Sequence, residues 1–179
     1  ASDVYKRQIF YDLGPKYGDD GGPAEGGEDR FIEVWNLVFM QFSNDGSGDL
    51  APLPQTGIDT GAGMERLLAV LQGVPSVWDI DLFEPLLSEA ERITGIKYGQ
   101  DAATDISMRI FADHARSTAL LISDGVFPSN EDRGYVLRRI IRRAVRHAWT
   151  LGVEDVVMPS LVEVVAGVMG DHYSELREN

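Results

Sequence analysis

Hydrophobic and polar positions alternate through the first third of the chain and recur every three or four residues after it. The clearest strand is Phe31–Phe42 (FIEVWNLVFMQF), which is rich in β-branched and aromatic residues. Shorter strands are predicted from Ile9 (IFYDL), over Leu50–Pro54, where two prolines limit pairing, and over Ile58–Thr60. Ser43–Asp49 has the composition of a turn, so these strands are predicted to form an antiparallel sheet.

Two polar residues interrupt the apolar Phe31–Phe42 strand. In a regular strand Glu33 and Asn36 lie on opposite faces, because side chains alternate. A β-bulge between them would bring both to one face. For a buried Asn36, hydrogen bonding to neighbouring backbone is the structural alternative to a binding role.

The stretch Gly57–Leu71 (GIDTGAGMERLLAVL) joins the last strand to the first helix. Its second half repeats leucine at helical spacing, which predicts a helix from about Gly61. Glycines such as Gly61 and Gly63 let the backbone approach a ligand or a facing strand closely. Arg66 is an unfavourable cation near a helix N-terminus, but its planar charge in a glycine-lined recess suits a polyphosphate. Pairing of Arg66 with a neighbouring acid is the alternative.

Two stretches interrupt the pattern of predicted strands and helices. Gly14–Asp29 is rich in glycine, proline and acids without a hydrophobic period, which predicts a loop with solvated charges. Gly73–Ser76 breaks the pattern, and we place a domain boundary there. Beyond it the periodicity predicts helices over Asp81–Thr94, Asp105–Ser123, Asn130–Leu151 and Pro159–Met169.

The third of these helices has two contrasting faces. Its apolar stripe consists of Leu137, Ile140, Ile141, Ala144, Val145 and Ala148. Its opposite face carries Arg138, Arg139, Arg142, Arg143 and Arg146. Ser129 is a candidate N-cap, with Asp132 completing a capping box. So many arginines with almost no interleaved acid favour nucleic-acid contact over a solvated face paired with acids elsewhere.

Composition narrows the possible functions. The net charge is −13, which argues against a generally basic nucleic-acid binder, yet six of the sixteen Lys and Arg residues lie between Arg133 and Arg146. Cysteine is absent, which excludes disulfides and thiolate metal sites. The histidines have no metal-ligand spacing, and no apolar run is long enough to span a membrane.

These segments together resemble a known family. Gly57–Leu71 resembles motif 3 of class II aminoacyl-tRNA synthetases, and Asp59 is similar to the aspartate of the alanyl-tRNA synthetases. EVWNLVFMQF before it and DGVFPSNEDRGYVLRRIIRRAVRH after it also resemble that family, so the likeness covers roughly Ile9 to Asn179. Ala62 and Met64 depart from the usual Met and Leu.

The resemblance implies an α+β fold: part of a class II antiparallel sheet with the motif 3 helix, followed by an all-α helical domain. Residues 9–75 would be the C-terminal part of the catalytic domain, and residues 76–179 an incomplete tRNA-recognition domain. Residues 1–8, which contain DVYKRQ, resemble translated adapter DNA and are expected to be non-native; the family would have a glutamate near Gln8.

The resemblance also implies roles in activating L-alanine with ATP. Asp59 would accept the ammonium of alanine, Gly61 would leave room for its methyl group, and Asn36 and Val38 would line the pocket. At the nucleotide, Arg66 would bind the γ-phosphate beside Gly63, and Glu33 would help to hold Mg²⁺ at the phosphates. No zinc site is implied.

For tRNA, the resemblance implies that the arginine helix contacts the acceptor stem of tRNA(Ala). The residues implied are Asn130, Arg138, Arg139, Arg142, Arg143 and Arg146, with Arg142 and Asn130 as partners at the G·U wobble pair. Nothing in the chain matches motifs 1 and 2 or the editing domain, so we expect a cytoplasmic synthetase fragment that is inactive alone. The alternative is a free-standing RNA-binding or regulatory module without activation activity.

Overall fold

The structure, a computed structural model, describes residues 4–25, 27, 29–44 and 46–178, with side chains from Lys6 onward. Positions 1–3 of the expected non-native head, 26 and 28 of the predicted loop, 45 of the predicted turn, and 179 lie outside the described residues. The chain divides into two compact units, Ala1–Ile80 and Asp81–Asn179. The division falls slightly after the expected Gly73–Ser76 because the 3₁₀ helix η1 (Val77–Asp79) packs against α1 (Met64–Gln72).

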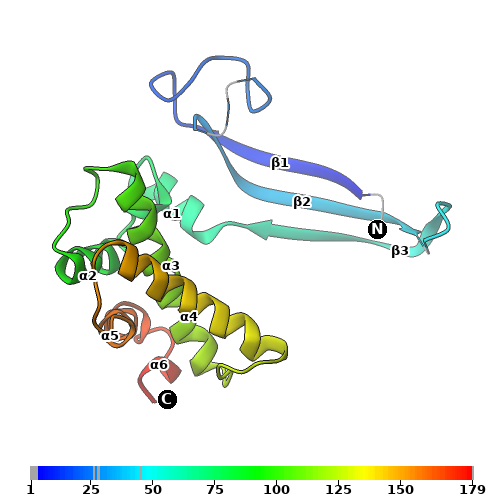
Figure 1. The fold of residues 1–179 in the computed structure, drawn as a ribbon. Helices are drawn as coiled ribbons and strands as arrows, with labels where there is room; N and C mark the ends of the chain where they lie inside the picture. The colour runs from blue at the N-terminus through cyan, green and yellow to red at the C-terminus, as the bar shows by residue number, and fades with distance from the viewer. Residues whose placement is uncertain (1–3, 26, 28, 45, 179) are drawn as a thin grey trace. The chain divides into compact units, whose positions relative to one another are not determined.

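The first unit is built on a three-stranded antiparallel sheet in the order β1-β2-β3 (Figure 1). The strands are β1 (Val4–Asp12), β2 (Phe31–Asn44) and β3 (Leu50–Ala62). β1 therefore begins before Ile9, and the described residues of the expected head pair with β2: Lys6 with Val38 and Gln8 with Asn36.

β3 is one continuous strand, whereas the sequence predicted two short strands, Leu50–Pro54 and Ile58–Thr60. A proline cannot donate to a ladder, and in a central strand it would leave a neighbouring carbonyl without its partner. β3 is an edge strand among the described residues, so it pairs on one side only, and Pro52 is accommodated opposite Phe42. A register shift between Met40 and Phe42 adjusts the pairing there.

A second register shift alters the faces of β2. Ile9 pairs with Trp35, but the next residue, Phe10, pairs with Glu33, so β2 has one extra residue, Val34. Because paired residues share a face and alternate along β1, Glu33 lies on the same face as Asn36. Of the two arrangements that the sequence left open, the structure therefore has the bulge. Val34 is 8% exposed, and its carbonyl accepts a hydrogen bond from Gly63 N (3.1 Å).

Helix α1 begins later than the sequence predicted. The predicted start at Gly61 is wrong, because Gly61 and Ala62 still pair with Asn36 and Trp35 in the sheet. Gly63 is the extended N-cap residue and α1 begins at Met64. The helix ends at Gly73, whose φ of 68° closes the last turn as glycine readily does.

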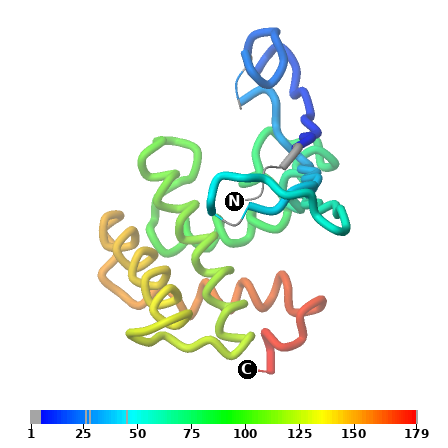
Figure 2. The backbone as a smooth tube through the Cα atoms, turned by 90° about the vertical axis from the view of Figure 1, so that its right-hand side faces the viewer, coloured from blue at the N-terminus to red at the C-terminus, as the bar shows by residue number. Residues whose placement is uncertain are grey.

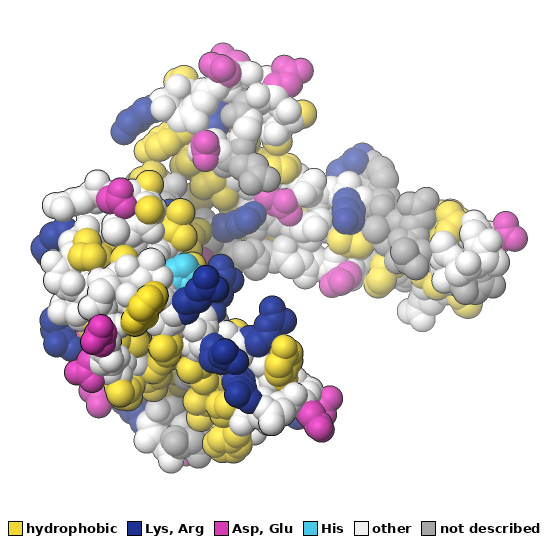
Figure 3. Space-filling model, viewed as in Figure 1, with side chains coloured by type: hydrophobic (Ala, Val, Ile, Leu, Met, Phe, Trp, Pro, Cys, Tyr) yellow, Lys and Arg dark blue, Asp and Glu magenta, His cyan; other side chains and the backbone are white. Residues whose placement is uncertain are grey.

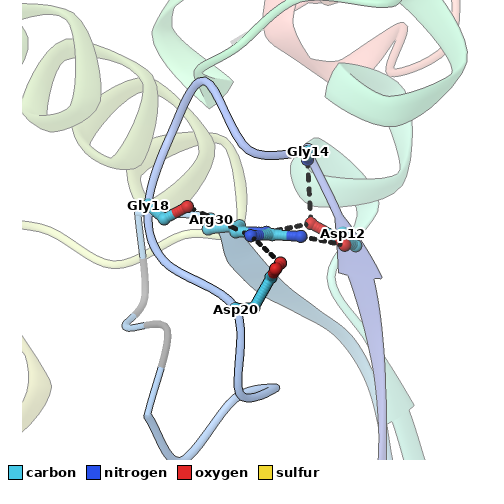
Figure 4. Close-up of polar contacts among 5 residues, drawn as sticks. All are labelled: Asp12, Gly14, Gly18, Asp20 and Arg30. Atoms are coloured by element: carbon cyan, nitrogen blue, oxygen red, sulfur yellow. Dashed lines mark hydrogen bonds and ion pairs between the residues drawn. The ribbon is translucent and has the colours of Figure 1, made fainter.

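A buried arginine holds the long connection between β1 and β2 (Figure 4). Arg30 is 6% exposed and binds Asp12 with two hydrogen bonds, from Nε to Oδ1 (2.7 Å) and from Nη2 to Oδ2 (3.0 Å). Its Nη1 donates to Asp20 Oδ1 (2.6 Å) and to the carbonyl of Gly18 (3.1 Å). Asp20, one of the loop acids expected to be solvated, is 93% exposed and also pairs with Arg30. We call this arrangement of Asp12, Gly18, Asp20 and Arg30 the Arg30 clasp.

The second unit consists of helices, and its described residues contain no strand. The helices are α2 (Glu84–Thr94), α3 (Ala102–Ser123), α4 (Asp132–Thr150), α5 (Met158–Met169) and the short α6 (Glu175–Glu178). The long α3 packs against each of the others, as Figures 1 and 2 show. α3 starts three residues before the predicted Asp105 because the carboxylate of Asp101 accepts hydrogen bonds from the Ala103 and Thr104 amides. Among the described helices, none has the length and apolar character needed to cross a membrane.

The core stripe of α4 is close to the predicted one. Leu137, Ala144 and Ala148 are buried, but Val145 is 48% exposed and does not belong to the core. Ser129 is not the N-cap. Its hydroxyl bonds the backbone of Glu131, which is the N-cap residue and makes no side-chain cap bond.

Replacing a core residue of α4 should cost far more than replacing Val145. Leu137→Ala removes a side chain with no exposed surface and should lower the free energy of unfolding by about 2–5 kcal/mol. Val145→Ala should change it by less than about 0.5 kcal/mol. Urea denaturation followed by helical circular dichroism measures both, and equal losses would place Val145 in the core.

The Arg30 clasp should make stability depend on acid pH. Hydrogen bonds from Arg30, then from the Gly14 amide, lower the pKa of Asp12 in the folded chain. The stabilisation is therefore complete above the unfolded pKa, about 3.9, and is lost as the pH falls through the lower folded pKa. Asp12→Asn should flatten this acid limb in plots of Tm against pH. An unchanged acid limb would show that Asp12 contributes nothing to it.

Candidate functional site

Strand pairing gathers the four residues expected to hold an amino acid. Asn36 pairs with Gly61, and two residues further along Val38 pairs with Asp59. Paired residues, and residues two apart on one strand, share a face of the sheet. The Asn36, Val38 and Asp59 side chains and the Gly61 backbone therefore border one patch, which we call the sheet-face recess.

The recess offers acceptors to a small cationic ligand. Asn36 Oδ1 is buried and has no hydrogen-bond partner among the described residues. A buried polar atom without a partner is rare in folded proteins, because its desolvation is then uncompensated. Opposite it, a Cβ placed on Gly61 would meet no heavy atom within 4 Å, so the space beside the amide is open. With the Asp59 carboxylate on the same face, the recess can accept hydrogen bonds from an ammonium group.

A second group of predicted residues lies beyond the bulge. Arg66 folds back from α1, and its Nη1 donates to the backbone carbonyl of Glu33 (2.7 Å). Gly63 makes this possible, because a Cβ there would lie 3.2 Å from Arg66 Cδ. The Glu33 carboxylate in turn accepts a hydrogen bond from Gln8 Nε2 (2.6 Å). The alternative of an Arg66 paired with a neighbouring acid is not what the structure shows, since the bond is to a carbonyl.

Glu33 and Arg66 line one cavity of about 620 Å³, which we call the bulge cavity. Its other walls are Gln8 and Phe10 of β1, Pro23 and Asp29 of the loop, Phe31 and Ile32 of β2, and Pro75, Ser76, Val77 and Trp78 after α1. The sequence analysis missed Gln8, which fell in the expected non-native head, and Trp78, which no motif marked.

The bulge cavity could hold a metal ion only together with a bound phosphate compound. In the described part of the chain no three His, Cys, Asp or Glu side chains gather as a metal site. Mg²⁺ is commonly held by one or two carboxylates together with substrate phosphates. Glu33 can supply one such carboxylate, and Arg66 a charge for the phosphates.

The arginine face of α4 forms a separate candidate site in the helical unit. Arg138, Arg139, Arg142, Arg143 and Arg146 are all exposed. Figure 3 shows Lys and Arg side chains gathered on this surface beside a histidine. A hollow of about 510 Å³ is lined by His114, Tyr135, Val136, Arg138, Arg139, Ile140, Arg142 and Arg143.

Two exposed aromatic residues accompany these arginines and were missed in the sequence. Tyr135 is 47% exposed and Trp149 is 69% exposed, and both stand at helical spacing from the arginines. The guanidinium of Arg139 lies 5.9 Å from the centre of the Tyr135 ring. Asn130, expected to act with Arg142 at the wobble pair, accepts a hydrogen bond from Arg138 Nη1.

His147, on α4, has a structural role. His147 Nδ1 lies 3.0 Å from Ser107 Oγ and so links α4 to α3. Burial, followed by the charges of Arg143, His114 and Arg146, lowers the pKa of His147. His147 is therefore neutral at pH 7 and adds no charge to the arginine face.

The chain is similar to known proteins over nearly all of its length. The family model described as tRNA synthetases class II (A) matches residues 3–179. The chain is 58% identical over 171 residues to an alanine–tRNA ligase of Acidithiobacillus ferridurans, covering 94% of this chain and 19% of that protein. It is 51% identical to the one of Bacillus velezensis and 49% identical to the one of Bacillus subtilis, in each case covering 96% of this chain and 20% of the relative. The chain thus spans about a fifth of the length of these relatives.

Proposed function

The chain belongs to the class II tRNA synthetase family, and on that premise we propose that it is a segment of an alanine–tRNA ligase. The complete enzyme would activate L-alanine with ATP and transfer it to the 3′ end of tRNA(Ala). In this proposal residues 9–75 belong to the catalytic domain and residues 76–179 form an all-α domain that contacts the tRNA. The relatives are named alanine–tRNA ligases, which supports alanine as the amino acid that is activated.

The observation that carries the proposal is the unpartnered Asn36 Oδ1 beside Asp59. Two acceptors on one face, one of them a carboxylate, suit the ammonium of an amino acid. Gly61 leaves open space beside these acceptors, and the methyl group of alanine would lie there. Among the described residues, Asn36 Oδ1 is the one buried side-chain amide oxygen that has no partner.

The bulge cavity would receive the phosphates of ATP. Arg66 would bind the γ-phosphate, and Glu33 would share Mg²⁺ with the phosphate oxygens. In this arrangement the amino acid would lie over the β2–β3 pairing and the phosphates on the other side of the bulge, on the same sheet face. Activation of alanine by ATP at such a site would depend on positioning and charge neutralisation, not on a covalent enzyme group. We propose that activation also needs residues beyond this chain, because motif 2 has no match in it.

Adding a methyl group at Gly61 should block the binding of alanine without destabilising the fold. The test protein is a chimera in which this chain replaces the corresponding segment of the Bacillus subtilis alanine–tRNA ligase. Gly61→Ala places a methyl group where alanine's own would lie, so kcat/KM for alanine in ATP–pyrophosphate exchange should fall about 10- to 200-fold. Thermal stability should be unchanged, because the new Cβ meets no atom within 4 Å.

Gly57→Ala is the matched control on the same strand and face. Its Cβ would meet only the flexible end of Met40, at 3.3 Å, and it lies outside the recess. Exchange should be near that of the unsubstituted chimera. Full activity of Gly61→Ala would move the alanine site elsewhere. No exchange by the unsubstituted chimera, with tRNA binding retained, would favour the RNA-binding module.

The arginine face should contain two kinds of tRNA contact. If Arg142 reads the wobble pair, Arg142→Ala in the chimera should reduce discrimination between G·U and G·C acceptor stems. Arg139→Ala should weaken both equally and reduce the salt slope of binding by about 0.7–0.9, as the loss of one phosphate contact does. Arg92→Ala, on exposed α2 surface, is the control and should alter neither quantity. Equal losses on both stems would make Arg142 a phosphate contact, and no loss would leave α4 a solvated helix.

A further inference from the structure

Arg30 is a charged residue that the fold buries, and no role was assigned to it from the sequence. It stands between the loop and β2, with Asp29 before it and Phe31 after it. Four of its hydrogen bonds are recorded, two to Asp12, one to Asp20 and one to the Gly18 carbonyl (Figure 4). Its guanidinium also lies 5.0 Å from the centre of the Phe31 ring.

The clasp joins parts of the loop that the chain itself keeps apart. Asp12 is the last residue of β1, at the base of the loop, whereas Gly18 and Asp20 lie well inside it. Leu13 N donates to the Arg30 carbonyl (2.9 Å), so the backbone closes the base and the side chain holds the middle. A buried guanidinium is costly unless its donors are satisfied, so the loop conformation that supplies Gly18 and Asp20 is favoured over others.

The same loop forms part of the bulge cavity. Pro23 and Asp29 line it together with Glu33 and Arg66, and Phe31 and Ile32 of β2 line it as well. Arg30 is not among the lining residues, although both of its chain neighbours are. The clasp therefore fixes the loop wall of the cavity from behind and leaves the cavity free for a ligand.

We propose that Arg30 is a positioning residue for the nucleotide: its clasp holds the loop wall of the bulge cavity at the width that a Mg²⁺-bound triphosphate needs. This rests on the proposed function and adds a residue that acts on one substrate only. Asn36 and Asp59, which are proposed to bind alanine, lie where β2 pairs with β3. No residue of the clasp takes part in that pairing. Loosening the clasp therefore affects ATP and spares alanine.

Asp20 is the best position for the test, because its carboxylate is 93% exposed and its replacement opens no core. In the chimera defined above, Asp20→Asn should raise the KM for ATP in pyrophosphate exchange about tenfold. The KM for alanine and kcat should stay within about twofold. Arg30→Lys keeps the charge but loses the bidentate hydrogen bonding to Asp12, so it should raise the KM for ATP further. Asp20→Glu keeps the carboxylate and should restore part of the ATP affinity.

Arg92→Lys is the matched control, because Arg92 makes a similar bidentate pair with Glu89 on α2 but is not among the residues that line the bulge cavity. It should leave both KM values unchanged. Equal rises in the two KM values, or no rise for ATP in Asp20→Asn, would overturn the proposal and leave the clasp a purely structural contact. If the unsubstituted chimera fails to exchange, the proposed function falls first and this inference falls with it.

Discussion

The extra residue at Val34 is the constraint on which the site of the first unit depends. Without it, Glu33 would lie on the opposite face of the sheet from Asn36, because side chains alternate along a regular strand. With it, Glu33, Asn36 and Val38 share a face, and cross-strand pairing adds Gly61 and Asp59. The bulge also leaves the Val34 carbonyl to receive the Gly63 amide, which anchors the start of α1. One backbone irregularity thus places both ends of the site and the helix that carries Arg66.

Glycine and arginine positions follow from this geometry. Gly61 leaves the space opposite Asn36 open, and Gly63 gives room for the stem of Arg66 to lie back towards Glu33. Arg66 then meets a carbonyl, so its charge is not neutralised by a carboxylate at that contact. A guanidinium held in this way keeps its attraction for an anionic ligand.

Local pattern was enough to predict β2 and the arginine helix, whereas the residues of the recess came from the family resemblance. Period-two and period-3.6 signals arise from neighbouring residues, so Phe31–Phe42 and the core residues Leu137 and Ala144 were visible in the sequence. The Arg30 clasp was not, because its partners stand 18 and 10 positions away and no local signal links them. The continuity of β3 was missed because proline rules assume a strand paired on both sides. The contact between Asn130 and Arg138 was also not visible, since helical spacing alone does not say which of several exposed arginines reaches a loop.

The register at Val34 can be measured directly, because the chain has no cysteine of its own. Paired residues in an antiparallel sheet approach closely enough for a disulfide, whereas residues on opposite faces do not. The account predicts that the double variant Phe10→Cys with Glu33→Cys forms a disulfide under mild oxidation. The double variant Phe10→Cys with Val34→Cys should not. Cross-linking of the Val34 pair in preference to the Glu33 pair would mean a regular strand, and Glu33 would then lie on the wrong face to share a site with Asn36 and Asp59.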